Sequence, residues 1–283
     1  MFTFKYETMK TIVVATDFSP AALNATNYAA DMALAINARL FLFHVYQLPL
    51  SVSDTPIVLL SVEELKESAE TKLAQLKNDI EHVTSGKIEI LTEARMGNLS
   101  DELEDLCSTQ QAFVVVMGTK GHSTMERVLF GSSTLSVIKH ITWPVIGVPL
   151  GKEYTPGIRK IGLACDFEAI RESTPVQGIR NFVKTFNAEL HVLNVDYENR
   201  HFKPETPMQS ELLHRELEDM KPTYHYIENR DIEDGINEFA ETNNLDIIIT
   251  IPKKHKRIGG LFKKSSTKQL VFESHVPVMC VHE

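Results

Sequence analysis

Glycines and hydroxyl-bearing residues gather in one short stretch of the chain, directly after the apolar run 113–117. Gly118 and Gly121 are followed, after nine residues, by Gly131 and the run 132–134 (SST). Glycine has no side chain, so neighbouring amides can approach a ligand closely or adopt positive φ. Free amides at a helix N-terminus, with nearby hydroxyls, bind anions. This spacing therefore predicts a site for a phosphate chain.

Each of these residues also has an ordinary structural explanation when it is taken singly. Gly121 can form a turn, Gly131 can lie in a loop and Ser132 can cap a helix, because such residues are common in these places. Their combination after a strand is the stronger evidence. Asp17 can likewise form a turn, but it lies just beyond the apolar run 11–15, and open α/β sheets bind ligands where parallel strands end.

The segments that must position these residues alternate between strand and helix patterns. Ser19 and Pro20 predict the start of a helix over Ala21–Ala38, and Ser61 with Glu64 predicts a capping box at a second helix. Short apolar runs with the character of buried strands precede and follow both helices. Such alternation predicts an α/β fold with a parallel sheet and helices on both faces.

The order of these elements occurs twice. Residues 114–145 align without gaps onto 247–278, and residues 10–20 correspond to 159–169, which places Asp166 opposite Asp17. An internal repeat of this length predicts two domains of one architecture.

The junction between the repeats is the segment 149–157, which holds two prolines and two glycines and lacks apolar periodicity. We therefore expect one domain over residues 1–151 and a second over 156–283. The link is short, so the two domains should stay packed together.

Composition excludes several function classes. The chain has 283 residues and a formal net charge of -9, which disfavours nucleic acid as a partner because such binding needs clustered lysine and arginine. No apolar run approaches the roughly 18 residues of a membrane span, and the N-terminus lacks signal-peptide features. Three cysteines without metal-ligand spacing fit a reducing compartment, so we expect a cytoplasmic protein without membrane partners.

Gly118, Gly121, Gly131 and Ser132 reproduce the pattern G-x2-G-x9-G-S/T, and with TDFS (16–19) they resemble the universal stress protein family. The resemblance covers nearly the whole chain, as two tandem family domains. It implies two Rossmann-like domains of the adenine nucleotide alpha hydrolase type. Each would be a five-stranded parallel sheet in the order 3-2-1-4-5 with four flanking helices.

The resemblance also implies a nucleotide site, since nucleotide-binding members of the family hold ATP, with or without Mg. Asp17 and the backbone around Val45 would bind adenine, Gly118 and Gly121 would line the ribose and phosphates, and the segment from Gly131 would hold the phosphate tail. The residues that it assigns to this site are Ala15, Thr16, Asp17, Val45, Met117, Gly118, Gly121, His122, Gly131, Ser132, Ser133 and Thr134.

The second half departs from this pattern. Ile251, Lys254 and Lys264 stand where the first half has glycines, and a branched side chain and lysines should obstruct the phosphates. We therefore expect ATP in the N-terminal domain only. The basic segment 253–268 is explained either as a solvated loop or as an anion site, and no role is assigned to it.

The last strand of each half, 145–148 and 278–281, is an apolar edge that must be covered. The resemblance implies that the two halves pair there as a pseudo-dimer and that homodimers can form.

The leading hypothesis for function is an ATP-binding protein with a regulatory role in the stress response. No general base is placed by the sequence and no Walker loop is present, so we assign no catalytic or metal-binding residue and expect weak ATPase or autophosphorylation at most. Two alternatives stay open. One is a slow nucleotide hydrolase or autophosphorylating phosphotransferase, and the other is a dimeric scaffold that binds no nucleotide.

Overall fold

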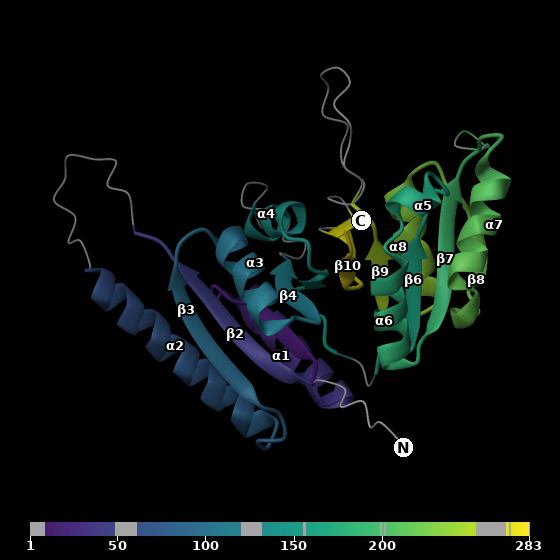
Figure 1. The fold of residues 1–283 in the computed structure, drawn as a ribbon. Coiled ribbons are helices and arrows are strands. Elements are labelled where there is room, and N and C mark those ends of the chain that lie inside the picture. The colour runs from purple at the N-terminus through teal and green to yellow at the C-terminus, as the bar shows by residue number, and fades with distance from the viewer. Residues whose placement is uncertain are drawn as a thin grey trace, which may run out of the picture.

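The computed structural model describes residues 9–48, 61–119, 132–154, 157–198, 200, 202–252, 270–271 and 273–282. Figure 1 shows the two halves of this chain side by side, with strands in the middle and helices packed against them. The described strands form one ten-stranded sheet in the order β3-β2-β1-β4-β5-β10-β9-β6-β7-β8.

The first half runs from β1 to β5 and the second half from β6 to β10. The elements of the first half are β1 (Thr11–Ala15), α1 (Pro20–Ile36), β2 (Arg39–Tyr46), α2 (Val62–Val83), β3 (Ile90–Met96), α3 (Leu99–Gln110), β4 (Val114–Thr119), α4 (Ser132–His140) and β5 (Val145–Pro149). Those of the second half are β6 (Lys160–Ala164), α5 (Ile170–Ser173), α6 (Val176–Phe186), β7 (Glu189–Asp196), α7 (Thr206–Leu217), the 3-10 turn η1 (Glu218–Met220), β8 (Thr223–Glu228), α8 (Ile232–Thr242), β9 (Ile247–Thr250) and β10 (Val278–Cys280).

Within each half the strands are parallel and follow the expected order 3-2-1-4-5. The halves are joined by β5 and β10, which pair antiparallel with Ile146 opposite Met279. The two apolar strands predicted to be edges therefore cover each other, and the pairing expected between the halves is present. Among the described residues no helix combines the length and apolarity that a membrane span needs.

The predicted starts of the first two long helices are confirmed. The side chain of Ser19 accepts a hydrogen bond from the Ala22 amide, and Ser61 with Glu64 forms the full capping box. The first helix ends at Ile36, two residues before the predicted end. Asn37 adopts the left-handed conformation there, with φ of 50°, which asparagine tolerates better than most residues and which ends the helix.

The first helix of the second half is divided in two, where the resemblance implies a single helix. α5 ends at Ser173 and α6 begins at Val176. Pro175 lies between them, and proline has no amide hydrogen to continue the helical hydrogen bonds. The equivalent residue of the first half, Thr26, lies inside the continuous helix α1.

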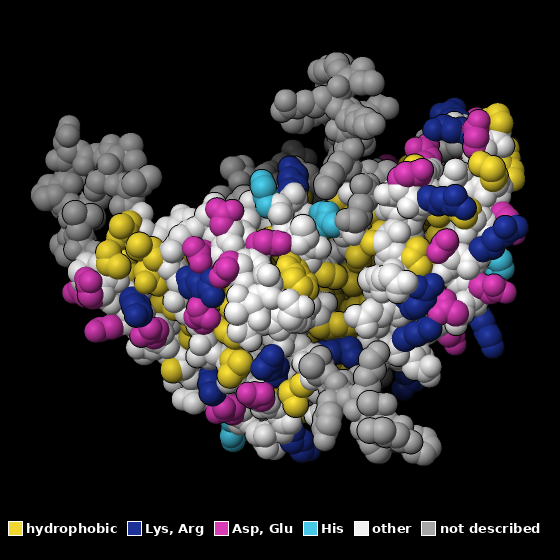
Figure 2. Space-filling view, viewed as in Figure 1, with side chains coloured by type: hydrophobic (Ala, Val, Ile, Leu, Met, Phe, Trp, Pro, Cys, Tyr) yellow, Lys and Arg dark blue, Asp and Glu magenta, His cyan; other side chains and the backbone are white. Residues whose placement is uncertain are grey.

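The core forms two layers, one on each face of the sheet, and both layers contain residues of both halves. One layer includes α1, α2, α6 and α7, and the other includes α3, α4 and α8. Phe113 of the first half stacks on Phe182 of α6 with 5.8 Å between ring centroids, and Figure 2 shows hydrophobic side chains between the halves. The two halves therefore share their buried surface and should unfold together.

Candidate functional site

The candidate site of the first half lies where β1 and β4 end. These strands are neighbours in the middle of the parallel half-sheet. β2, the strand that follows β1 in the chain, lies on the side of β1 opposite to β4. The strand order therefore reverses between β1 and β4, which is where open α/β sheets bind ligands. Thr16 and Asp17 follow β1, and Gly118 and Thr119 end β4.

The turn after β1 is held by its own side chains. The Phe18 amide donates to Thr16 Oγ1 over 3.1 Å, and the Ser19 amide donates to Asp17 Oδ1 over 3.0 Å. Phe18 has a φ of 63°, a conformation that non-glycine residues adopt infrequently. Asp17 is exposed, so its carboxylate is both fixed by the turn and open to a ligand.

His44 fixes this turn from the neighbouring strand. Its Nδ1 lies 2.8 Å from the carbonyl oxygen of Thr16, and its ring packs on Phe18 with 4.7 Å between centroids. A carbonyl only accepts hydrogen bonds, so Nδ1 carries the proton. Val45, the adjacent residue, is half-buried. The sequence motifs do not predict this role of His44, although a polar residue within the apolar run 40–45 is a signal for one.

Gly118 has a packing role that the sequence did not reveal. A Cβ atom at this position would lie 2.4 Å from the carbonyl oxygen of Ala21 in the first turn of α1. The glycine is therefore required for close contact between β4 and α1, whether or not a ligand also approaches it.

Thr134 connects the start of α4 to the end of β4. It is buried, and its hydroxyl donates a hydrogen bond of 3.1 Å to the carbonyl oxygen of Gly118. That single proton is used inside the fold, where it joins α4 to β4. Ser133, one residue earlier, is exposed in the first turn of α4, where amides lack helical partners.

The remaining predicted residues divide into two groups. Ala15 and Met117 are buried with their side chains in the core, so only their backbone can contribute to a site. Gly121, His122 and Gly131 lie outside the described residues, and so does the side chain of Ser132.

The second half repeats the turn after its first strand. Asn194 Nδ2 donates to the Cys165 carbonyl over 2.9 Å, as His44 does to Thr16, and the Glu168 amide donates to Asp166 Oδ1 over 3.0 Å. The position of Gly118 is occupied by Ile251, which packs against the core. Residues 253–269, which follow β9 in the chain, lie outside the described residues.

A metal site of the protein's own is not evident in the described part of the chain, where no three histidine, cysteine, aspartate or glutamate residues are placed to hold an ion. The first-half site therefore offers the amides in the first turn of α4, the hydroxyl of Ser133 and the fixed carboxylate of Asp17. Amide and hydroxyl donors of this kind can bind a phosphate, and a carboxylate can accept from an amino group.

Comparisons with known proteins agree with this architecture. A model of the universal stress protein family matches residues 8–149 and 157–282. A universal stress protein of Methanocaldococcus jannaschii is 30% identical over 152 residues, 51% of this chain and 84% of that protein. The structure of a universal stress protein from Archaeoglobus fulgidus matches with a TM-score of 0.72 and 16% identity. The match covers 96% of this chain and 98% of the Archaeoglobus chain.

A structure of a functionally unknown Pseudomonas aeruginosa protein has a TM-score of 0.61 and 13% identity, and the match covers 97% of this chain and 92% of that chain. At these identities the structural matches show the fold alone. The family model, in contrast, matches the sequence twice and spans nearly all of it. The chain therefore belongs to the universal stress protein family and carries two copies of the family domain in tandem.

Proposed function

We propose that the first half binds an adenine nucleotide, in the first instance ATP, and that binding regulates the protein during the stress response. The observation that carries the proposal is the tie between Thr134 and Gly118, because it brings the amides of α4 to the strand end beside Asp17. Phosphate would bind at the start of α4, with its charge favoured by the helix dipole. Adenine would bind beside Asp17 and Val45.

The proposal limits nucleotide binding to the first half. Ile251 in the second half carries a branched side chain at the position of Gly118, and it packs against the core. Lys254 and Lys264 replace the two other motif glycines. We therefore expect one ATP for each chain, with Mg bound through the phosphates where it is present.

A calorimetric titration of the full chain with ATP tests both parts. Asp17→Asn keeps the oxygen that accepts from Ser19 but removes a second acceptor, so ATP affinity should fall about tenfold. Asp166→Asn is the matched control, since Asp166 forms the equivalent turn in the second half. It should leave affinity and stoichiometry unchanged. Two equivalent sites per chain, or equal losses in both variants, would contradict the proposal.

A second variant places a negative charge where the phosphate tail is proposed to bind. Ser133→Glu adds a carboxylate to the exposed first turn of α4, a position where acidic residues stabilise helices. The fold should therefore persist while ATP affinity falls by about tenfold or more through charge repulsion. Unchanged affinity would place the phosphates elsewhere.

The proposed role needs binding, not rapid turnover. Incubation with ATP followed by mass spectrometry separates this role from autophosphorylation, which would leave a phosphate on Ser132 or Ser133.

A further inference from the structure

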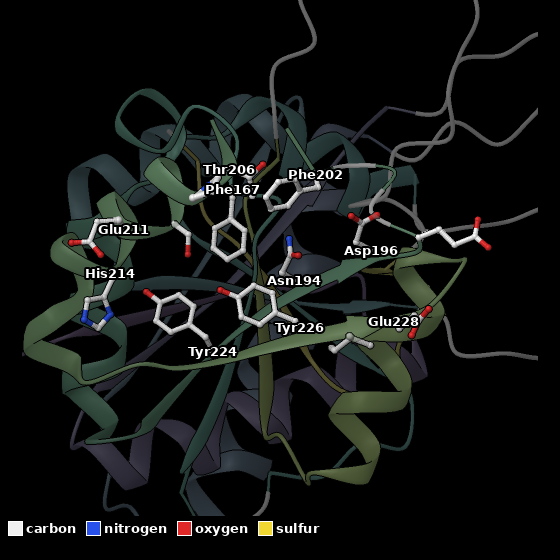
Figure 3. A pocket seen from close by; sticks show the side chains of 14 residues that line it. Phe167, Asn194, Asp196, Phe202, Thr206, Glu211, His214, Tyr224, Tyr226 and Glu228 are labelled. Atoms are coloured by element: carbon white, nitrogen blue, oxygen red, sulfur yellow. The ribbon is translucent and has the colours of Figure 1, made fainter. Parts of the chain in front are cut away.

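A cavity of about 870 Å³ lies in the second half, away from the proposed nucleotide site. It is bounded by β7, β8 and α7, and Figure 3 shows aromatic rings around it. The ring of Phe167 lies 6.2 Å from that of Tyr226 and 6.5 Å from that of Tyr224, between centroids. The volume is in the range of small-molecule sites, and Tyr226 is 69% exposed, so the aromatic wall is accessible.

The charges of the cavity wall have one sign. Four carboxylates line it, and its described lining residues include no lysine or arginine. Glu211 pairs with Arg215, and Glu198 pairs with Arg200. Both pairs are exposed to solvent, where an ion pair contributes little to stability. A phosphate would be repelled from this wall, whereas a cation would be attracted to it.

One tyrosine of the cavity wall has a buried hydroxyl. The Tyr224 oxygen is shielded from solvent and has no hydrogen-bond partner among the described residues. Burial, with smaller effects from Cys165, Tyr226 and Glu211, raises the pKa of Tyr224 to about 12, so the hydroxyl stays protonated. Tyr224 therefore contributes a neutral aromatic ring to the cavity wall.

The first half supplies a cation of its own at the equivalent place. Phe18 corresponds to Phe167, and Lys72 Nζ of the long helix α2 lies 5.6 Å from the Phe18 ring centroid. Helix α7 has 12 residues where α2 has 22. By strand register, Tyr224 and Tyr226 replace Thr92 and Ala94 of the first half. The second half thus has aromatic rings at two positions where the first half has none, and the described residues that line its cavity include no lysine or arginine.

We propose that this cavity binds a small organic cation, a protonated or quaternary amine on a ring-containing body. The charge would lie against the aromatic faces of Phe167 and Tyr226 and near the carboxylate of Glu228, while the ring would pack within the cavity. The two halves then bind chemically different ligands, an anion in the first and a cation in the second.

Three probes with one carbon skeleton test the proposal: 2-phenylethylammonium, 2-phenylethanol and phenylacetate. In calorimetric titrations of the full chain, the ammonium ion should bind saturably, the alcohol at least about threefold more weakly, and phenylacetate without detectable heat. Excess ATP should not displace the ammonium ion. Equal binding of all three probes, displacement by ATP, or no saturable binding of the ammonium ion would overturn the proposal.

Variants locate the binding. Tyr226→Ala and Glu228→Gln change exposed side chains of β8, so the fold should persist, and each should weaken 2-phenylethylammonium about three- to fivefold. Glu241→Gln, an exposed carboxylate on α8 outside the cavity lining, is the control and should have no effect. Wild-type affinity in both β8 variants would show that the amine binds elsewhere and would overturn the assignment.

Discussion

The hydroxyl of Thr134 and the carbonyl of Gly118 form a 3.1 Å hydrogen bond that joins the start of α4 to the end of β4. Thr134→Val keeps the shape of this buried side chain but removes the donor. The carbonyl then loses a partner, at a cost of about 1–3 kcal/mol. We expect a lower urea midpoint and weaker ATP binding, with both restored in Thr134→Ser. Full ATP affinity in the valine variant would show that this bond does not position the site.

His44 and Asn194 perform the same task in the two halves, so the first should tolerate replacement by the second. His44→Asn offers an amide donor to the Thr16 carbonyl, as Asn194 does to Cys165. His44→Leu offers none. We expect the leucine variant to lose about 1 kcal/mol or more of stability and part of its ATP affinity, and the asparagine variant to retain most of both. Equal losses in the two variants would assign the effect to ring packing on Phe18.

His225 predicts a loss of stability in mild acid. Its pKa is lowered below the ordinary value of 6.5, first by burial and then by His191, whose Nδ1 lies 2.9 Å from His225 Nε2. The unfolded chain therefore binds this proton at higher pH than the folded chain. The stabilisation is complete above about pH 6.5 and is lost as the pH falls from there through the lowered pKa.

Urea midpoints measured between pH 7.5 and pH 5.5, a range of about one unit either side of 6.5, test this effect. His225→Gln should make the midpoint depend less on pH. His214→Gln changes an exposed side chain of α7 and should leave the pH dependence as in the wild type. If the urea midpoint changed equally with pH in the wild type and in both variants, His225 would be excluded as the source of the pH dependence.

Phe182 couples the two halves through its stack on Phe113. It is 1% exposed, and Phe182→Ala should cost about 3–5 kcal/mol. Since each core layer contains residues of both halves, thermal unfolding should remain one transition at a lower temperature. Differential scanning calorimetry measures this. Two separate unfolding transitions in the wild type would contradict a shared core.

The edge strand β5 predicts the behaviour of the isolated first half. A chain ending at residue 151 lacks β10, which pairs with β5 along Val145, Ile146 and Gly147. An apolar edge without its partner associates with other copies. Sedimentation should show dimers or larger species, and Ile146→Lys should reduce them. A stable monomer would mean that β5 is protected without β10.

Features that depend on residues close in the sequence were predicted well. The cap at Ser19 and the box of Ser61 and Glu64 involve atoms no more than three residues apart, so the local sequence is sufficient to specify them. The resemblance supplied the strand order, and the internal repeat indicated that this order occurs twice. The break at Pro175 has a local signal, the proline itself, but the repeat does not predict it because the equivalent residue of the first half is Thr26.

The sequence by itself determined that the chain holds two related α/β units and that the first of them carries a run of glycines and hydroxyl residues of a type that predicts a phosphate site. Only the tertiary structure decided that Gly118 makes room for α1, that His44 holds the turn at Asp17, and that rings from three distant segments enclose a cavity. Thr16 contacts His44, and Phe167 contacts Tyr226, although each pair is far apart in the sequence and no periodic pattern connects its members. Their meeting depends on the register and order of strands, and those are fixed by burial of the whole sheet.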